Sequence, residues 1–310
     1  MKNLLLITIF LLVASGGISQ EGTISRDLKV NSLVYGTLLQ PKAESTDIII
    51  IIGGSGPTDR NGNQQMMQNN SLKMLAQDLA QEGIASFRYD KRIFTLLKQR
   101  ALQEEKLRFD DFIEDAVSVI DYFKKKNNFK RIFVLGHSQG ALVGMLAALQ
   151  TPVDGYISLA GAGQSIDQVI VNQIGIQMPG LKDETIEALA TLKEKGKVKD
   201  FNPALASILR SELQPFMASW MQYDPAQEIK KLNVPVLVVN GTKDLQVDVQ
   251  EAQYLQAALP VAQLEIIENM NHVLKTVMGN DMENAKTYND TSIALSEKLV
   301  PALKDFLQKN

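Results

Sequence analysis

Two periodicities of apolar residues alternate along most of this chain. Apolar runs with the length of strands occupy residues 32–39, 47–52, 84–89, 131–135, 155–159, 234–240 and 264–267. Between them, apolar residues recur at helical spacing over residues 72–82, 109–126, 141–149, 249–258 and 293–308. Strands that alternate with helices predict an α/β fold, with a mostly parallel sheet covered by helices on both faces. We expect residues 22–30 to pair with residues 32–39 as a leading antiparallel hairpin.

The alternation stops over residues 164–226, where only helical spacing remains. We therefore predict an all-helical insertion in which Pro215 bends the last helix. Three of its apolar residues, Phe216, Met217 and Trp220, are candidates to line an acyl pocket. They belong to a stripe that also includes Met178 and Met221, and packing of the insertion against the core is the favoured role for most of these five residues.

The sequence Gly136-His137-Ser138-Gln139-Gly140 carries the strongest chemical signal. It matches Gly-x-Ser-x-Gly, follows an apolar strand-like run and precedes a helix-like stretch, which is the context of a nucleophile elbow. Such a turn accepts only small residues at its ends and exposes the serine hydroxyl above a helix N-terminus. Ser138 is therefore the predicted nucleophile.

A serine hydroxyl needs a general base, and the base needs an acid that orients it. The chain has two histidines. His137 is adjacent to Ser138, and neighbouring side chains diverge at such a turn, so it does not reach the hydroxyl. His272, which follows the last strand-like run, is the predicted base.

The acid is expected after a strand, between nucleophile and base in chain order. Asp244 follows the apolar run 234–240 and is the predicted acid. Asp248 competes with it, but its place directly before the predicted helix 249–258 favours a role as the helix N-cap.

The order Ser138, Asp244, His272 resembles the α/β-hydrolase superfamily, and the resemblance covers essentially the whole mature chain. Two further motifs are similar to those of the bacterial esterase and serine-aminopeptidase-like branch. Residues 53–62 match its Gly-Gly-Ser-Gly-Pro-x-Asp-Arg-x-Gly loop, and residues 241–247 match its Gly-x-x-Asp-x-x-Val acid loop. These motifs are specific for the fold and the catalytic triad but not for the substrate.

The resemblance also implies an oxyanion hole formed by two backbone N–H groups. One belongs to Gln139, and the other to Ser55 or, as second choice, Gly54. The alternatives for the glycine-rich loop are a plain turn or a phosphate cradle, and the cradle lacks its Gly-Lys-Ser/Thr ending. Asp59 and Arg60 are expected to brace this loop.

One departure from the branch follows the next strand. Relatives usually carry Arg-Tyr-Asp-x-Arg-Gly-x-Gly, whereas this chain has Arg-Tyr-Asp-Lys-Arg at residues 88–92 and then Ile93-Phe94-Thr95. Because both glycines are missing, we expect a differently shaped loop beside the site.

Composition and charge limit the number of domains and the kinds of partner and cofactor that we expect. The 310 residues, 45% of them hydrophobic, suffice for one large α/β domain with a small insertion. A net charge of −3 without a basic stripe speaks against a nucleic-acid partner. The chain has no cysteine and no Cys-His ligand spacing, so no metal, no disulfide and no lipoprotein anchor is expected. The predicted chemistry requires no cofactor.

The N-terminus has the pattern of a secretory signal peptide over residues 1–19. A charged start is followed by an apolar run, residues 4–13, and then by small residues. The run is too short to span a bilayer well, although an uncleaved anchor is the alternative. Cleavage before Gln20 would release a secreted or periplasmic protein without stable membrane anchoring.

These observations predict an α/β-hydrolase core formed by residues 20–163 and 227–310, with a helical lid at residues 164–226. The expected activity is that of a serine hydrolase acting on a small-molecule ester of short or medium acyl chain through an acyl-enzyme. A serine peptidase of the aminopeptidase type and a catalytically silent binding protein are the alternatives.

Overall fold

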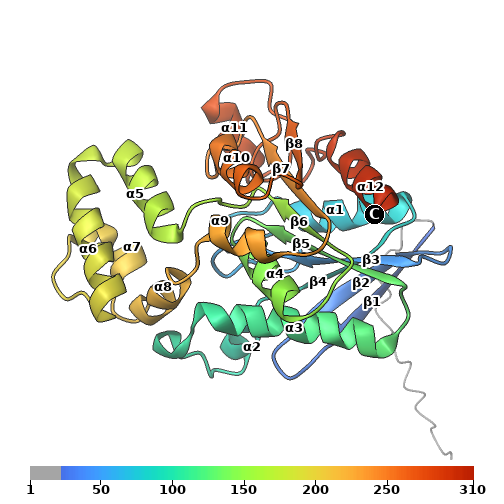
Figure 1. Cartoon of the computed structure of the whole chain (residues 1–310), viewed down its shortest axis with the longest axis horizontal. Coiled ribbons are helices and arrows are strands. Elements are labelled where there is room, and N and C mark those ends of the chain that lie inside the picture. The colour runs from blue at the N-terminus through green and yellow to red at the C-terminus, as the bar shows by residue number, and fades with distance from the viewer. Residues whose placement is uncertain (1–21) are drawn as a thin grey trace, which may run out of the picture.

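The computed structural model describes residues 22–310 and confirms the α/β architecture, with one mixed sheet between two helical layers (Figure 1). Within these residues the strand order is β1-β2-β4-β3-β5-β6-β7-β8. β2 pairs antiparallel with β1 and with β4, and the remaining neighbours are parallel. The bounds are β1 Thr23–Lys29, β2 Tyr35–Pro41, β3 Asp47–Ile52, β4 Ala85–Tyr89, β5 Arg131–His137, β6 Gly155–Leu159, β7 Val236–Gly241 and β8 Gln263–Ile267.

Each face of the sheet buries its own hydrophobic cluster. On one face lie α3 (Phe109–Lys126), α4 (Gln139–Gln150) and α10 (Val249–Ala258), and on the other α1 (Ser71–Gln81) and α12 (Leu299–Lys309). β3 shows why both faces are filled: Ile48, Ile50 and Ile52 belong to the first cluster, whereas Ile49 and Ile51 belong to the second. A strand buried on both sides reads as a continuous apolar run, as the sequence does here.

Between β6 and β7 the chain forms helices only. They are α5 (Ile166–Gln177), η2 (Pro179–Leu181), α6 (Lys182–Lys195), η3 (Pro203–Leu205), α7 (Ala206–Leu209), α8 (Gln214–Trp220), α9 (Pro225–Glu228) and η4 (Ile229–Lys231). Figure 1 shows α5 to α8 grouped beside the sheet, on the side away from α12. Pro215 does not bend a helix, contrary to our prediction: it lies in the first turn of α8, where its missing N–H leaves no hydrogen bond unmade.

Three short helices complete the fold: α2 (Arg92–Lys98), η1 (Glu104–Lys106) and α11 (Asp281–Thr287). α2 begins where relatives carry glycines, and Arg92 at its start is held by Asp111 at 2.6 Å and Asp115 at 2.8 Å. The predicted signal peptide lies outside the described residues. Among those described, no helix has the length and apolar character needed to cross a membrane.

Candidate active site

Ser138 occupies a strained turn between β5 and α4. Its backbone angles, φ 56° and ψ −124°, lie where non-glycine residues are rarely found. The turn is closed by two glycines. A Cβ at position 136 would lie 2.0 Å from the Gly140 carbonyl oxygen, and one at position 140 would lie 2.4 Å from the Ile52 oxygen. Glycine is therefore required at both ends of the turn, which explains the two glycines of the Gly-x-Ser-x-Gly motif.

Asp244 and His272 form the polar pair that the strand order predicted. The His272 Nδ1–H group donates to Asp244 Oδ2 at 2.8 Å, and both side chains are buried. The other carboxylate oxygen, Oδ1, accepts from the backbone N–H groups of Gln246 and Val247 at 2.8 and 2.9 Å. The carboxylate is thus fixed on both sides, and its bond to Nδ1 leaves Nε2 of His272 as the basic nitrogen.

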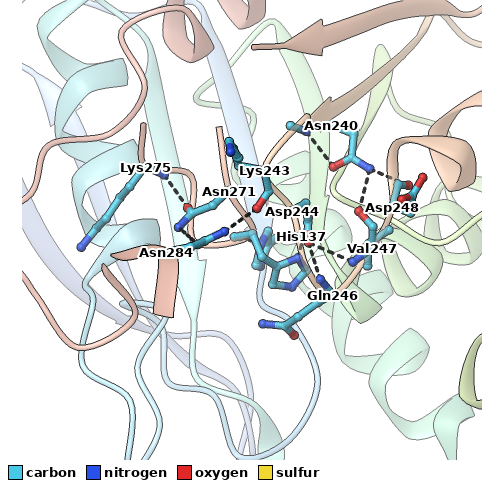
Figure 2. A network of polar contacts seen from close by, with 12 residues as sticks. His137, Asn240, Lys243, Asp244, Gln246, Val247, Asp248, Asn271, Lys275 and Asn284 are labelled. Carbon is cyan, nitrogen blue, oxygen red and sulfur yellow. Dashed lines mark hydrogen bonds and ion pairs between the residues drawn. The ribbon is translucent and has the colours of Figure 1, made fainter. Parts of the chain in front are cut away.

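Asp248 takes the capping role. Its side chain accepts from the Gln250 N–H at 2.8 Å at the start of α10. Asn240, at the end of β7, holds the intervening loop by donating to the carbonyl oxygens of Val247 and Asp248, at 3.1 Å each. Figure 2 shows this loop, with the Asp244 side chain joined by dashed lines to Gln246 and Val247.

A second asparagine joins the acid loop to the base loop. Asn284 of α11 donates to the Lys243 carbonyl at 2.7 Å and accepts from Asn271 at 2.8 Å (Figure 2). Asn271 precedes His272 and also receives the Lys275 N–H at 2.9 Å. Because Lys243 and Asn271 each adjoin a member of the pair, α11 fixes both turns relative to each other. The sequence carried no signal for this bridge.

His137 packs against His272 and binds its backbone. Its Nε2–H group donates to the His272 carbonyl oxygen at 2.8 Å, and the two ring centroids lie 4.8 Å apart. Burial, together with the neighbouring His272, lowers the pKa of His137 to about 3. The ring is therefore neutral at ordinary pH and serves as a hydrogen-bond donor, not as a base.

The glycine-rich loop after β3 lies against the elbow. A Cβ on Gly54 would be 3.2 Å from Ser138 Cβ, so the backbone approaches the serine closely. Asp59 accepts from the loop's own N–H groups at 2.8 and 2.9 Å, and Arg60 binds Asp90 at 2.6 Å, which confirms that both residues brace the loop. Gln139 is the first residue of α4, where helix N–H groups have no partner within the helix.

Lys91 is a charged residue at the elbow that the sequence reasoning missed. It is 5% exposed, and its Nζ donates to the Gln139 side-chain oxygen at 2.7 Å. Its ammonium lies 4.9 Å from the centre of the Phe112 ring. Burial lowers the pKa of Lys91 to about 7. In the sequence it stands between Asp90 and Arg92, a context that is typical of solvated lysines and hides its burial.

Two cavities meet at Ser138. The larger, about 170 Å³, lies against the helical insertion and is lined by apolar side chains together with glutamines: Leu142, Ile166, Val169, Trp220, Pro225, Val247, Gln139, Gln164, Gln173 and Gln246. The smaller, about 40 Å³, is lined by His272 and mainly by polar residues of the glycine-rich loop and of the segment that leads from it into α1. Ser55, Ser138 and Gln246 line both. Ser138 and His272 therefore line the same cavity, although no hydrogen bond joins their side chains in the described structure. In enzymes, hydrogen bonds between catalytic groups often tighten only around the substrate.

Of the three residues predicted to line an acyl pocket, the structure brings only Trp220 to the larger cavity. Phe216 and Met217 point into the core instead. The Phe216 ring packs against Phe109 and Phe112, with centroids 6.1 and 5.6 Å apart. Packing of the insertion on α3 takes the Phe216 side chain, whereas Trp220 both stacks on Phe109, with centroids 5.4 Å apart, and lines the cavity.

An eight-stranded, mostly parallel sheet with a strained serine after β5 defines the protein as an α/β hydrolase. A family described as serine aminopeptidase, S33, matches residues 68–276, and the chain belongs to this family. It is also 27% identical over 263 residues to the esterase EstD of Thermotoga maritima, a match that covers 83% of this chain and 61% of that relative. The chain thus spans less than two thirds of the length of EstD.

Solved structures agree on the fold. Est1E from Butyrivibrio proteoclasticus has a TM-score of 0.58 at 18% identity, over 93% of this chain and 98% of its own. The acylaminoacyl peptidase of Pyrococcus horikoshii has a TM-score of 0.51 at 16% identity, over 87% of this chain and 40% of its own. At such identities the likeness shows the fold alone, and the reaction has to be inferred from the residues of the site.

Proposed function

We propose that this protein is a serine esterase that hydrolyses carboxylic esters of short to medium acyl chain through an acyl-enzyme. Ser138 attacks the acyl carbonyl while His272 takes its proton, and Asp244 holds the imidazole in the required tautomer. The Gln139 and Ser55 amides, with Gly54 as the alternative donor, hold the oxyanion. His272 returns the proton to the departing alcohol, and water then releases the acid.

One observation carries this proposal: His272, which forms a buried pair with Asp244 at 2.8 Å, lines the same cavity as a serine in a strained elbow. A structural histidine has no need of a neighbouring strained serine, whereas acyl transfer needs both. The resemblance to an esterase supports ester bonds as the substrate.

Aminopeptidase activity is the second candidate because of the family to which the chain belongs. An aminopeptidase holds the substrate's ammonium group with a carboxylate. Neither cavity has an aspartate or glutamate among the described residues that line it. The lining therefore favours a neutral ester over a charged amino-terminal residue.

We further propose that the helical insertion, residues 164–226, acts as a lid that selects the acyl group. α5 contributes Ile166 and Val169 to the larger cavity, and Gln173 donates to the Gln246 carbonyl at 3.1 Å beside the acid loop. These contacts support a role of the insertion as a cover over the site, while the sheet holds the reacting groups. We also propose that the protein is exported and acts in the periplasm or outside the cell.

The test is hydrolysis of p-nitrophenyl esters alongside aminoacyl-p-nitroanilides. We expect turnover of the esters, and a loss of about three to six orders of magnitude in Ser138→Ala, because the covalent step disappears while the oxyanion donors remain. Circular dichroism checks that the variant is folded. Activity within tenfold of wild type would remove Ser138 from its role, and preferential cleavage of the anilides would favour the peptidase. Failure of Ser138 to react with a fluorophosphonate would indicate a silent binding protein.

A further inference from the structure

Lys91 is a buried charge to which the proposed mechanism assigns no role. Asp115 lines the same small cavity, of about 10 Å³, but its carboxylate is bound by Arg92, whose Nε and Nη2 donate to it at 2.8 and 2.9 Å. Among the described residues, Lys91 therefore has no carboxylate of its own. A buried ammonium without a counter-charge is costly. Groups in such surroundings cluster at functional sites, so the position of Lys91 calls for an explanation.

Lys91 lies between the two segments that carry the predicted oxyanion donors. It follows β4, the glycine-rich loop follows β3, and Ser138 follows β5; these three strands are adjacent and parallel, so all three segments lie at one edge of the sheet. Lys91 Nζ donates to Gln139 Oε1 at 2.7 Å, which places the ammonium within one side chain's length of the Gln139 backbone N–H. Lys91 also shares its small cavity with Gly53, which directly precedes the predicted donors Gly54 and Ser55.

Two properties of the ammonium matter at this position. A protonated lysine only donates hydrogen bonds, so it fixes the Gln139 side chain with its oxygen toward Nζ. Its positive charge also reaches the elbow, because it is one of the causes that lower the pKa of His137. In the proposed reaction a negative charge forms at the Gln139 N–H, and a fixed positive charge in a water-poor site stabilises it strongly. The oxyanion is thus the counter-charge that the resting protein does not give to Lys91.

We propose that Lys91 is a positioning residue of the oxyanion hole: its ammonium holds the Gln139 side chain and places a positive charge near the two donor N–H groups. The proposal rests on the proposed esterase function and adds a residue to its machinery. It implies that the enzyme stabilises the tetrahedral intermediate better while Lys91 is protonated.

The titratable and charged groups packed around Lys91 come from β4, α2, α3 and β5. They are Tyr89, Arg92, Asp115 and His137. Burial raises the pKa of Tyr89 and lowers that of His137 to about 3, while Asp115 and Arg92 bind each other. Burial lowers the pKa of Lys91 to about 7, so its charge is present at pH 6 and largely lost at pH 9.

The experiment measures kcat and KM for p-nitrophenyl butyrate from pH 6 to pH 9 in wild type and Lys91→Met. The ratio of the two kcat values should be about tenfold at pH 6, which is less than the 10²–10³ lost with a direct oxyanion donor. The ratio should approach one at pH 9, because wild type has then lost the charge as well. KM should change less than about twofold, since the uncharged ester gains nothing from the ammonium before the oxyanion forms. Lys130→Met, which removes an exposed lysine, is the matched control and should follow wild type.

A second variant tests the route through Gln139. Gln139→Met keeps the backbone N–H but removes the acceptor for Lys91, so it should also lower kcat at pH 6. Because the two side chains act as a unit, adding Gln139→Met to Lys91→Met should lower kcat by less than about a further twofold. Circular dichroism checks folding, and Gln139→Met alone tests the proposal if Lys91→Met does not fold.

Three results would overturn the proposal: equal kcat for wild type and Lys91→Met at pH 6, a loss that is the same at pH 6 and pH 9, or fully additive effects of the two substitutions. The chain has two histidines, and His137 stays neutral, so proton NMR can follow the His272 ring in each protein. A change in its titration that accounts for the kcat ratio would mean that Lys91 acts through the base, which refutes the proposal too. If wild type hydrolyses no p-nitrophenyl ester, the proposed esterase function fails and this inference with it; an active Lys91→Met with the wild-type pH profile refutes only the role of Lys91.

Discussion

Replacing Lys91 by methionine should change how the stability of this protein depends on pH. The ammonium is buried beside the Gln139 side chain, and burial lowers the pKa of Lys91 from 10.5 to about 7. No aspartate or glutamate is within ion-pair distance of it among the described residues, so its hydrogen bond to Gln139 and its contact with Phe112 are its main compensation. Methionine has a similar unbranched shape without the charge.

The sign follows from proton binding. Between pH 7 and 10.5 the unfolded chain holds the lysine proton while the folded protein has largely released it, so the stability of wild type rises with pH across this window. With these two pKa values, the protonation penalty is about 4 kcal/mol at pH 7 and about 2 kcal/mol at pH 9. Lys91→Met has no such penalty. The variant's loss of the hydrogen bond to Gln139 is a pH-independent offset, so the slope of the difference is diagnostic.

Urea denaturation at pH 7, 8 and 9 measures this slope. The free energy of unfolding of wild type minus that of Lys91→Met should rise by about 2 kcal/mol from pH 7 to pH 9. Other titrating groups cancel in the subtraction. Lys130→Met, which removes an exposed lysine, is the control and should run parallel to wild type. Parallel curves for Lys91→Met as well would refute the burial of a charge at the elbow.

Three further predictions concern catalysis and processing. Asp244→Asn should lower kcat by about 10³–10⁴, because an amide donor facing Nδ1 forces the wrong imidazole tautomer. Asp248→Asn should change kcat little, because asparagine also caps helices. The reverse ranking of the two variants in parallel ester assays would exchange their roles. Trp220→Ala should shift the preferred acyl chain of p-nitrophenyl esters toward longer chains, because each buried CH₂ adds about 0.8 kcal/mol until the cavity is full. If the preferred chain length does not change, Trp220 is a packing residue. Mass spectrometry of the exported protein should find a start near Gln20, and an intact Met1 in membrane fractions would contradict cleavage.

The elements that position the site were largely predictable from the sequence. The isoleucine run of β3 and the apolar run before Asn240 indicate strands buried on both faces, and such strands place the residues that follow them at one edge of the sheet. The turn at Ser138 was predictable for a steric reason. Gly136 and Gly140 have no room for a Cβ, so only glycine is compatible with this turn and the motif indicates its geometry. Chain order then selected Asp244 as the partner of His272, and the structure brings these two side chains together.

Other features depend on tertiary contacts that leave no local pattern. Lys91 and Asn284 are polar residues in polar stretches, and only the packing of α2 and α11 makes one buried and the other a bridge. Phe216 and Trp220 are four residues apart, which puts them near each other on a helix, yet one packs on α3 and the other also reaches the cavity. Periodicity identifies the buried face of a helix but not what that face meets.

The arrangement separates the bond-breaking groups from the groups that select the substrate. The predicted triad lies on turns after β5, β7 and β8, and these turns are fixed by Asn240, Asn284 and the glycines of the elbow. The larger cavity is walled mainly by the insertion and the smaller one by the loop after β3 and the residues that lead into α1. The two walls belong to different segments and share only Ser55, Ser138 and Gln246 among the described residues. Substitutions elsewhere in one wall should therefore add to substitutions in the other with little coupling. Substrate preference can therefore change while the predicted triad stays the same, and the family match over residues 68–276 does not specify the substrate.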